Sequence, residues 1–122
     1  MIDSVIIVCD NSPIGKNSAA EAVRLGSGFI ALGEIIDCEI IFRGDAVLLF
    51  SKHIDPTKVK MDPLDEVVEM ADLSDLPISL IDKDLEDLGL MKEDLVDYEN
   101  LGIISHAEMI KKIEAASTCF RI

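Results

Sequence analysis

Five residues that could do chemistry lie at and just after the end of the first apolar stretch. Cys9 ends that stretch, and a polar loop with Asn11, Ser12, Gly15 and Lys16 follows it. Such polar groups at the start of a helix can hold a small anion. A cysteine beside a helix N-terminus can also have a lowered pKa and act as a nucleophile. Two candidate sites follow, a ligand-binding loop and a reactive thiol, and their alternatives are a plain structural turn and a buried core cysteine.

The loop departs from the phosphate loop of nucleotide hydrolases. That motif needs a glycine five positions before Gly15, where Asp10 stands, and Ser or Thr after Lys16, where Asn17 stands. Asp10 would repel phosphate, and its charge would raise the pKa of the neighbouring Cys9 thiol. We therefore do not expect nucleotide hydrolysis, whereas binding of a small anion by the loop stays open.

Metal motifs are incomplete in this sequence. His53 and His106 are the only imidazoles, and neither belongs to a cluster with ligand spacing. The run Asp82–Glu86 begins like a calcium-binding loop with Glu93 at its twelfth position, but Asp87 occupies the sixth position, where the sharp turn requires glycine. We expect no metal, no cofactor and no catalytic residue besides the Cys9 candidate, so enzymatic activity is not expected.

The composition indicates a small cytoplasmic domain with contact surfaces. The 122 residues are the usual size of one domain, which we expect to span 1–122. Apolar residues make up 49 %, a surplus that favours a face buried between subunits. No apolar run approaches the ~18 residues that cross a bilayer, and the N-terminus does not resemble a signal peptide. Three cysteines cannot all pair within one chain, so we expect reduced thiols, with Cys38 and Cys119 as packing residues.

Acidic residues dominate the charge of the chain. The formal net charge is −13, and the segment Asp62–Glu99 holds 14 acidic residues but only Lys83 and Lys92 as basic ones. Phosphate backbones repel such a surface, so this chain alone is not expected to bind nucleic acid. The acidic surface can simply aid solubility, or it can contact a basic partner.

Apolar strands alternate with amphipathic helices. This order predicts a parallel sheet that is covered on both sides. The expected fold is therefore α/β, a single three-layer domain with a mainly parallel sheet of about five strands. Strands are expected at 2–9, 35–43, 78–81, within 95–104 and at 118–122, and helices at 19–32, 46–51, 63–76, 82–88 and 106–116.

Several local signals set the helix ends and faces. Ser18 with Glu21, and Ser105 with Glu108, are expected to form capping boxes. Gly33 is expected to end the first long helix. Spacing also predicts which side chains of the last helix face inward: Met109, Ile110, Ile113 and Ala116.

Together these segments resemble the DsrE/DsrF-like family, most closely its TusC/DsrF-type branch. The resemblance rests on the order of five segments: SVIIVCDNSPIG, SAAEAVRLGSGFIALG, IIFRGDAVLLF, LPISLIDKDLEDLGL and STCFRI. It implies a small α/β sandwich, assembly with itself or with homologous small subunits, and a role in cytoplasmic sulfur relay. In such systems persulfide sulfur passes between cysteines of different proteins.

One departure from the family matters for function. Sulfur-carrying members place a cysteine just after the strand that corresponds to 76–81, where this chain has Ile81 and Asp82. A persulfide needs a thiolate, so the resemblance implies a non-catalytic structural or regulatory subunit. Two alternatives stay open: a homo-oligomeric protein that binds an anion or metabolite at the loop after the first strand, and a thiol protein that acts through Cys9.

Overall fold

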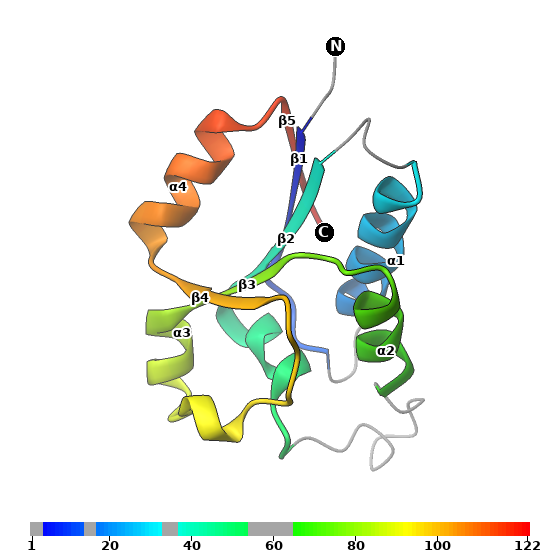
Figure 1. Ribbon diagram of the computed structural model, residues 1–122. Helices are drawn as coiled ribbons and strands as arrows, with labels where there is room; N and C mark the ends of the chain where they lie inside the picture. The colour runs from blue at the N-terminus through cyan, green and yellow to red at the C-terminus, as the bar shows by residue number, and fades with distance from the viewer. Residues whose placement is uncertain (1–3, 14–16, 33–36, 54–64) are drawn as a thin grey trace.

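The structure is a computed structural model that describes residues 4–13, 17–32, 37–53 and 65–122. Five strands form one sheet in the order β4-β3-β2-β1-β5, and every neighbouring pair is parallel (Figure 1). The α/β class and the parallel sheet predicted from the sequence are thereby confirmed. The strands are β1 (Ser4–Cys9), β2 (Asp37–Phe42), β3 (Ile78–Ile81), β4 (Leu101–Ile104) and β5 (Thr118–Arg121).

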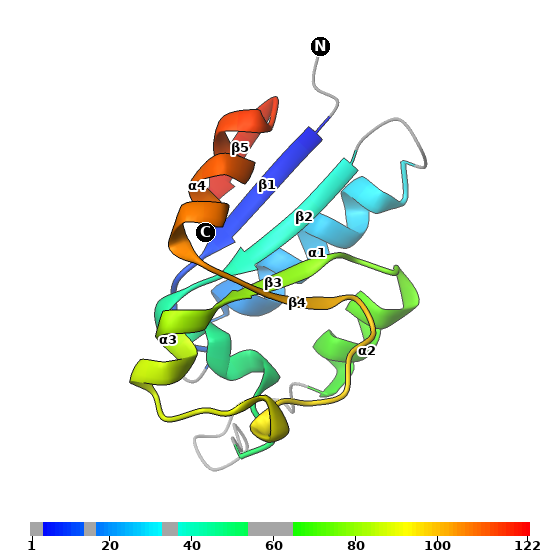
Figure 2. The same cartoon turned by 60° about the vertical axis from the view of Figure 1, so that its left-hand side comes forward.

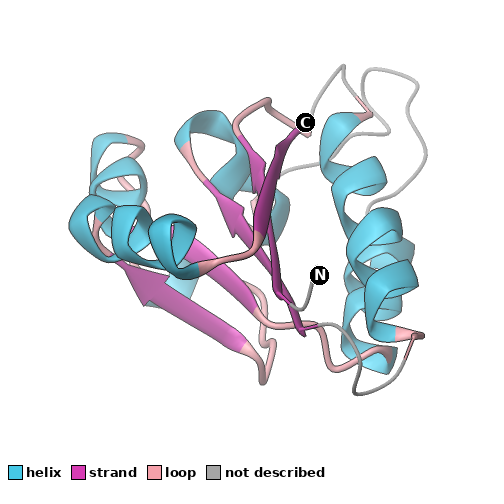
Figure 3. Cartoon of the chain, turned by 90° about the horizontal axis from the view of Figure 1, so that it is seen from above, coloured by secondary structure: helices cyan, strands magenta, loops and turns pink. Residues whose placement is uncertain are grey.

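Helices cover both faces of the sheet. Helices α1 and α2 lie on one face, and α3 and α4 lie on the other, so the sheet is the middle of three layers (Figures 1 and 3). None of the helices in the described ranges is both long and apolar enough to cross a membrane. The helical segments are α1 (Ser18–Ile30), the 3-10 helix η2 (Gly44–Phe50), α2 (Asp65–Leu73), α3 (Asp82–Asp87), the short 3-10 turn η4 (Lys92–Asp94) and α4 (His106–Ala115).

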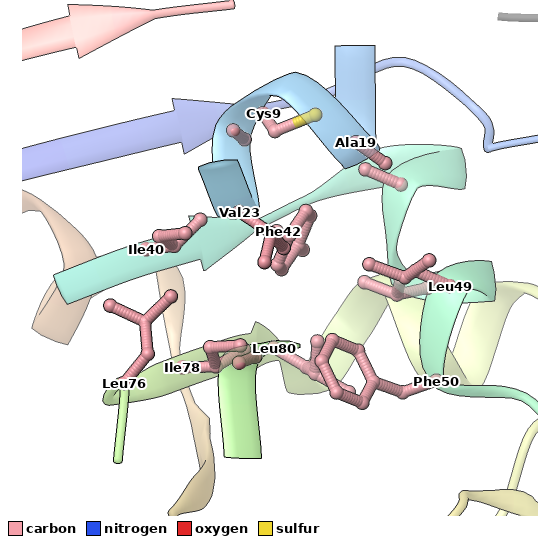
Figure 4. Packing of buried hydrophobic residues seen from close by; sticks show 14 of the residues in the cluster. Cys9, Ala19, Val23, Ile40, Phe42, Leu49, Phe50, Leu76, Ile78 and Leu80 are labelled. Atoms are coloured by element: carbon pink, nitrogen blue, oxygen red, sulfur yellow. The ribbon is translucent and has the colours of Figure 1, made fainter. Parts of the chain in front are cut away.

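Alternate residues of the strands face two separate apolar cores. On β1, Val5 and Ile7 face the core beneath α1, whereas Ile6 and Val8 face the core beneath α4. This alternation is why the central strands are apolar on both sides. The larger core, shown in Figure 4, joins the sheet to α1, α2 and η2.

A buried glycine lets α1 approach the sheet closely. A Cβ atom built on Gly26 would lie 2.9 Å from Cδ1 of Ile40 and 3.1 Å from Cδ2 of Leu76. Both of those side chains are fully buried. The position therefore has no room for a larger residue without movement of the core.

The second predicted helix cap is confirmed, and the first is wrong. Ser105 caps α4, because its hydroxyl accepts a hydrogen bond from the Glu108 backbone N–H at 3.2 Å. Ser18, by contrast, is already the first residue of α1, and Asn17 occupies the cap position. The Glu21 carboxylate is bound by Arg24 and Asn17 instead of closing a capping box.

Two predicted inward-facing residues are exposed. Ile110 is 52 % exposed, because α4 buries only a narrow face with Met109 at its centre. Cys119 is also exposed, because β5 is an edge strand whose residues are poorly covered. The expected ends of other elements at Gly33 and at residues 35–36 and 62–63 lie outside the described residues.

Candidate functional site

The carboxyl ends of the five strands meet at one edge of the sheet, the edge where α/β proteins of this kind place ligands. Figure 2 shows β1 and β2 side by side and pointing in the same direction. The residues that follow them are therefore brought together by the parallel register, in which Cys9 pairs with Phe42. Both sites predicted from the sequence begin at this edge.

Cys9 lies inside the core at the end of β1. Its exposed fraction is 0 %, and it belongs to the same buried cluster as Ala19 and Val23 of α1 (Figure 4). Burial raises the pKa of its thiol, the Asp10 charge raises it further, and a hydrogen bond from the Asn11 backbone opposes the shift. A thiol held protonated and enclosed is a poor nucleophile, so this geometry favours the packing interpretation of Cys9.

The described part of the predicted ligand-binding loop lies beside this edge. Asn11 and Ser12 are half-buried directly after β1, and Pro13 is buried. Gly15 and Lys16, the other two predicted ligand-binding residues, lie outside the described residues. Anion binding by this loop therefore stays a prediction.

A charged cluster that the sequence analysis did not identify joins three strands at this edge. The Asp10 carboxylate accepts hydrogen bonds from Arg121 at 2.6 Å and 3.1 Å, and Arg43 Nη1 lies 4.0 Å from the same oxygen. The Arg43 Nε atom is buried and has no hydrogen-bond partner in the described part of the chain. One signal could have indicated the cluster, since each of these residues stands at the end of a predicted strand.

Ile81 and Asp82 stand where the sequence analysis expected a sulfur-carrying member of the family to have its cysteine. Ile81 is fully buried at the end of β3 and immediately precedes α3. Asp82 begins α3, and its carboxylate accepts the Lys83 backbone N–H at 2.7 Å. Two residues later, the Asp84 carboxylate accepts the N–H of Gly44 at 2.8 Å and so ties α3 to the start of η2. Neither an aliphatic side chain nor a carboxylate can form a persulfide.

The two remaining cysteines lie away from this position. Cys38 is buried in β2, where burial and the neighbouring charge of Glu39 raise its pKa to about 11. Cys119 is exposed on the edge strand β5, and β1 and β2 separate this strand from β3. In the described ranges, no group of three or more His, Cys, Asp or Glu side chains could hold a metal ion.

A second polar cluster lies on the α4 face of the sheet. The Glu39 carboxylate accepts a hydrogen bond from the Ser79 hydroxyl at 2.8 Å and from Lys112 Nζ at 3.1 Å. These contacts join β2 and β3 to α4. Because Ser79 donates to Glu39 and is itself almost fully buried, the cluster is an anchor for the helix and not an arrangement for attack on a substrate.

Comparisons with known proteins agree with this architecture. The structure resembles the ychN protein from E. coli with a TM-score of 0.81 and 17 % identity, over 99 % of this chain and 100 % of that one. It also resembles MTH1491 of Methanobacterium thermoautotrophicum, a protein of unknown function, with a TM-score of 0.70 and 14 % identity over 98 % of this chain and 99 % of the other. No curated protein matches the sequence closely enough to count as a relative. The sequence pattern of the DsrE/DsrF-like family matches residues 3–117, and the chain therefore belongs to that family.

Proposed function

We propose that this protein is a non-catalytic structural or regulatory subunit of a DsrE/DsrF-like assembly of the TusC type, in cytoplasmic sulfur relay. The observation that carries the proposal is the pair Ile81 and Asp82 at the end of β3, where sulfur-carrying members of the family have a cysteine. A sulfur relay needs a thiolate at the point of transfer. Without one, the subunit contributes its surfaces to the assembly.

The state of the three cysteines supports this proposal. The thiols of Cys9 and Cys38 are buried and have raised pKa values. Cys119 is exposed, but burial of part of its side chain raises its pKa as well. None of the three is thus prepared as a thiolate at neutral pH, which is the form that accepts sulfur.

The charge distribution suggests what kind of partner the subunit contacts. Helices α2 and α3, which lie on opposite faces of the sheet, each expose carboxylates to solvent. An acidic surface of this kind favours a partner that presents basic residues, and it speeds the encounter of the two proteins at low salt. The exposed acidic residues of these two helices and of the turn between them and β3 are Glu66, Glu69, Asp72, Asp75, Asp82, Glu86 and Asp87.

Two measurements test the proposed function. Purification of the complex from the native source should recover small homologous subunits, at least one of which carries the family cysteine, in fixed stoichiometry with this chain. Incubation of that complex with isotopically labelled cysteine sulfur should label the homologue and leave this chain unlabelled. Covalently bound sulfur on this polypeptide at the level of its partner would contradict the proposal.

A second candidate function is binding of a small anion or metabolite at the loop after β1. The observation that favours it concerns Arg43, whose Nη1 lies 4.0 Å from the carboxylate of Asp10, the first residue of this loop. The Nε atom of Arg43 is buried and has no hydrogen-bond partner in the described part of the chain. A ligand that binds only the folded state raises its melting temperature as the ligand concentration increases. A thermal-shift series with phosphate, sulfate and carboxylates, at constant ionic strength, should identify such a ligand. A flat response across the series would contradict this candidate.

A further inference from the structure

A cavity of about 510 Å³ lies beside the edge strand β4. Its walls come from β4, from η4 and the chain that joins η4 to β4, and from Lys52, which lies just after η2. The chain between η4 and β4 forms a wide loop below the edge strand in the view of Figure 2. Five of the eight lining residues are apolar or aromatic, and three are charged. A volume and a lining of this kind are typical of sites that bind small organic molecules.

The apolar wall of the cavity includes a part of β4 that is only partly covered. Side chains alternate along a strand, and Ile104 faces the core beneath α4, so Leu101 and Ile103 face the other side of the sheet. Leu101 packs against the larger core, but Ile103 is 42 % exposed at the edge of the sheet. A ligand whose apolar part covers Ile103 removes apolar surface from water, which favours binding.

Packing and hydrogen bonds hold the other walls of the cavity in place. Tyr98 is almost fully buried, and its ring packs edge-on against Phe50. Leu95 is buried and forms an antiparallel bridge with Ser51. Val96 donates its backbone N–H to the Phe50 carbonyl at 2.7 Å. Because these walls are ordered before a ligand arrives, binding costs little conformational entropy of the protein.

Two lysines give the lining of the cavity an excess of positive charge. Among the described basic residues, only Lys52, Lys92 and Lys111 form no ion pair with a described carboxylate, and the first two line this cavity. The lining also contains one carboxylate, that of Asp97, so one positive charge is in excess. In a chain with a net charge of −13, such a site favours a ligand with a single negative charge.

The charge of Lys52 is not taken up by its acidic neighbour. The Lys52 Nζ atom donates to the Glu93 carbonyl at 3.2 Å, a bond that uses one of its three N–H donors. The charge of Asp94 acts on Lys52, but the Asp94 carboxylate already accepts the Met91 N–H and pairs with the His53 ring, both at 2.8 Å. Lys52 is therefore anchored beside the cavity with donors left for an acidic group.

We propose that this cavity binds a small organic anion with an apolar body and a single acidic group, such as a medium-chain carboxylate. The apolar body lies against Ile103, and the acidic group faces Lys52 and Lys92. The site is distinct from the loop after β1, because β2 and β3 separate β1 from β4 in the sheet. The inference goes beyond the proposed function and does not depend on it.

Displacement of a fluorescent probe from the full chain tests this inference. The probe is anilinonaphthalene sulfonate, an aromatic anion whose emission rises in apolar surroundings. At about 0.15 M salt, which screens distant charges, the wild-type chain should bind the probe saturably. Octanoate should displace the probe. Octanamide has the same chain length and no charge, so it should displace the probe at least about fivefold more weakly.

Matched variants place the probe in this cavity. Lys52→Gln and Lys92→Gln should each raise the Kd of the probe about two- to fivefold, and the double variant should raise it about tenfold. Ile103→Thr should raise it about threefold through loss of apolar contact. Lys111→Gln is the control, because it removes the same charge from an exposed lysine of α4 that does not line the cavity. It should leave the Kd unchanged.

Three results would each overturn the inference. They are a wild-type chain that shows no saturable probe binding up to about 1 mM, equal displacement by octanoate and octanamide, and equal effects of Lys92→Gln and Lys111→Gln. All the substituted side chains are exposed, so the variants should fold. If one does not, the comparison of octanoate with octanamide on the wild type still decides. None of these results affects the proposed function, which depends on the labelled-sulfur measurement and on recovery of homologous subunits.

Discussion

The one tyrosine of the chain offers a direct test of the packing between β3 and the segment after α3. Tyr98 is 7 % exposed, and its hydroxyl donates a hydrogen bond to the Leu76 carbonyl at 2.6 Å. Its ring packs edge-on against Phe50, with centroids 5.6 Å apart. Burial, followed by the nearby charges of Asp72 and Asp75, raises the pKa of the phenol from 10.0 to about 12.

This pKa makes stability depend on pH in a defined window. Between pH 10 and pH 12 the unfolded chain has lost the Tyr98 proton while the folded chain retains it, so the free energy of unfolding falls as pH rises. Each pKa unit is worth 1.36 kcal/mol, and the shift of about two units corresponds to about 2 to 3 kcal/mol in total. The contribution is fully present below pH 10 and is lost by about pH 12.

The assay reads this residue alone, because the chain contains one Tyr and no Trp. Tyrosinate absorbance followed against pH should show a midpoint near 12 for the folded protein and near 10 in concentrated guanidinium. In Tyr98→Phe the ring contact remains and the hydrogen bond is lost, so the free energy of unfolding at neutral pH should fall by about 1 kcal/mol. The fall in stability above pH 10 should be smaller in this variant by the amount given above. A folded-state midpoint near 10 would refute the buried, hydrogen-bonded placement of Tyr98.

Three further predictions concern α1, α4 and the thiols. Gly26→Ala should lower the free energy of unfolding, measured in urea, by about 1 to 2 kcal/mol, because overpacking of the core outweighs the gain in helix propensity. Equal or greater stability of the variant would contradict the close contact of α1 with the sheet. Ser105→Ala should cost about 1 kcal/mol in the same assay through loss of the α4 cap, and an unchanged stability would show that the cap contributes nothing. Alkylation of the folded protein at pH 7.5 should modify Cys119 first and leave Cys9 and Cys38 unmodified, as read by mass spectrometry. Early modification of Cys9 would instead favour a reactive thiol at the end of β1.

The sequence predicted the sheet well because its central strands have a strong local signal. The run that became β1 is apolar at five successive positions, Val5–Cys9, which is typical of a strand buried on both faces. The end of the helix expected at 82–88 also has a local cause, since Gly89 follows it and adopts a φ of +71° that other residues avoid. In these places the local preference and the tertiary structure agree.

The misassigned residues depend on tertiary contacts that local patterns do not contain. Ile110 has the spacing of a buried residue, yet α4 contacts only one flank of the sheet and leaves it exposed. Cys119 lies in a strand, but its exposure follows from the edge position of β5, which is a matter of strand order. The Asp10 cluster joins residues 111 positions apart, and only the pairing of β5 with β1 brings them together.

The pairing of β5 with β1 also orders the steps by which the sheet is assembled. Ser117 donates its backbone N–H to the Ser4 hydroxyl across 113 residues, whereas Ser4 pairs with Asp37 across a gap about one third as long. Closing the longer loop costs about 1 kcal/mol more chain entropy, unless β4 and α4 are already in place to bridge the gap. We therefore expect the last strand to join late during folding. Until it does, β1 has a free hydrogen-bonding edge that a neighbouring unfinished chain can occupy, which makes exchange of β5 between molecules the characteristic misfolding hazard of this topology.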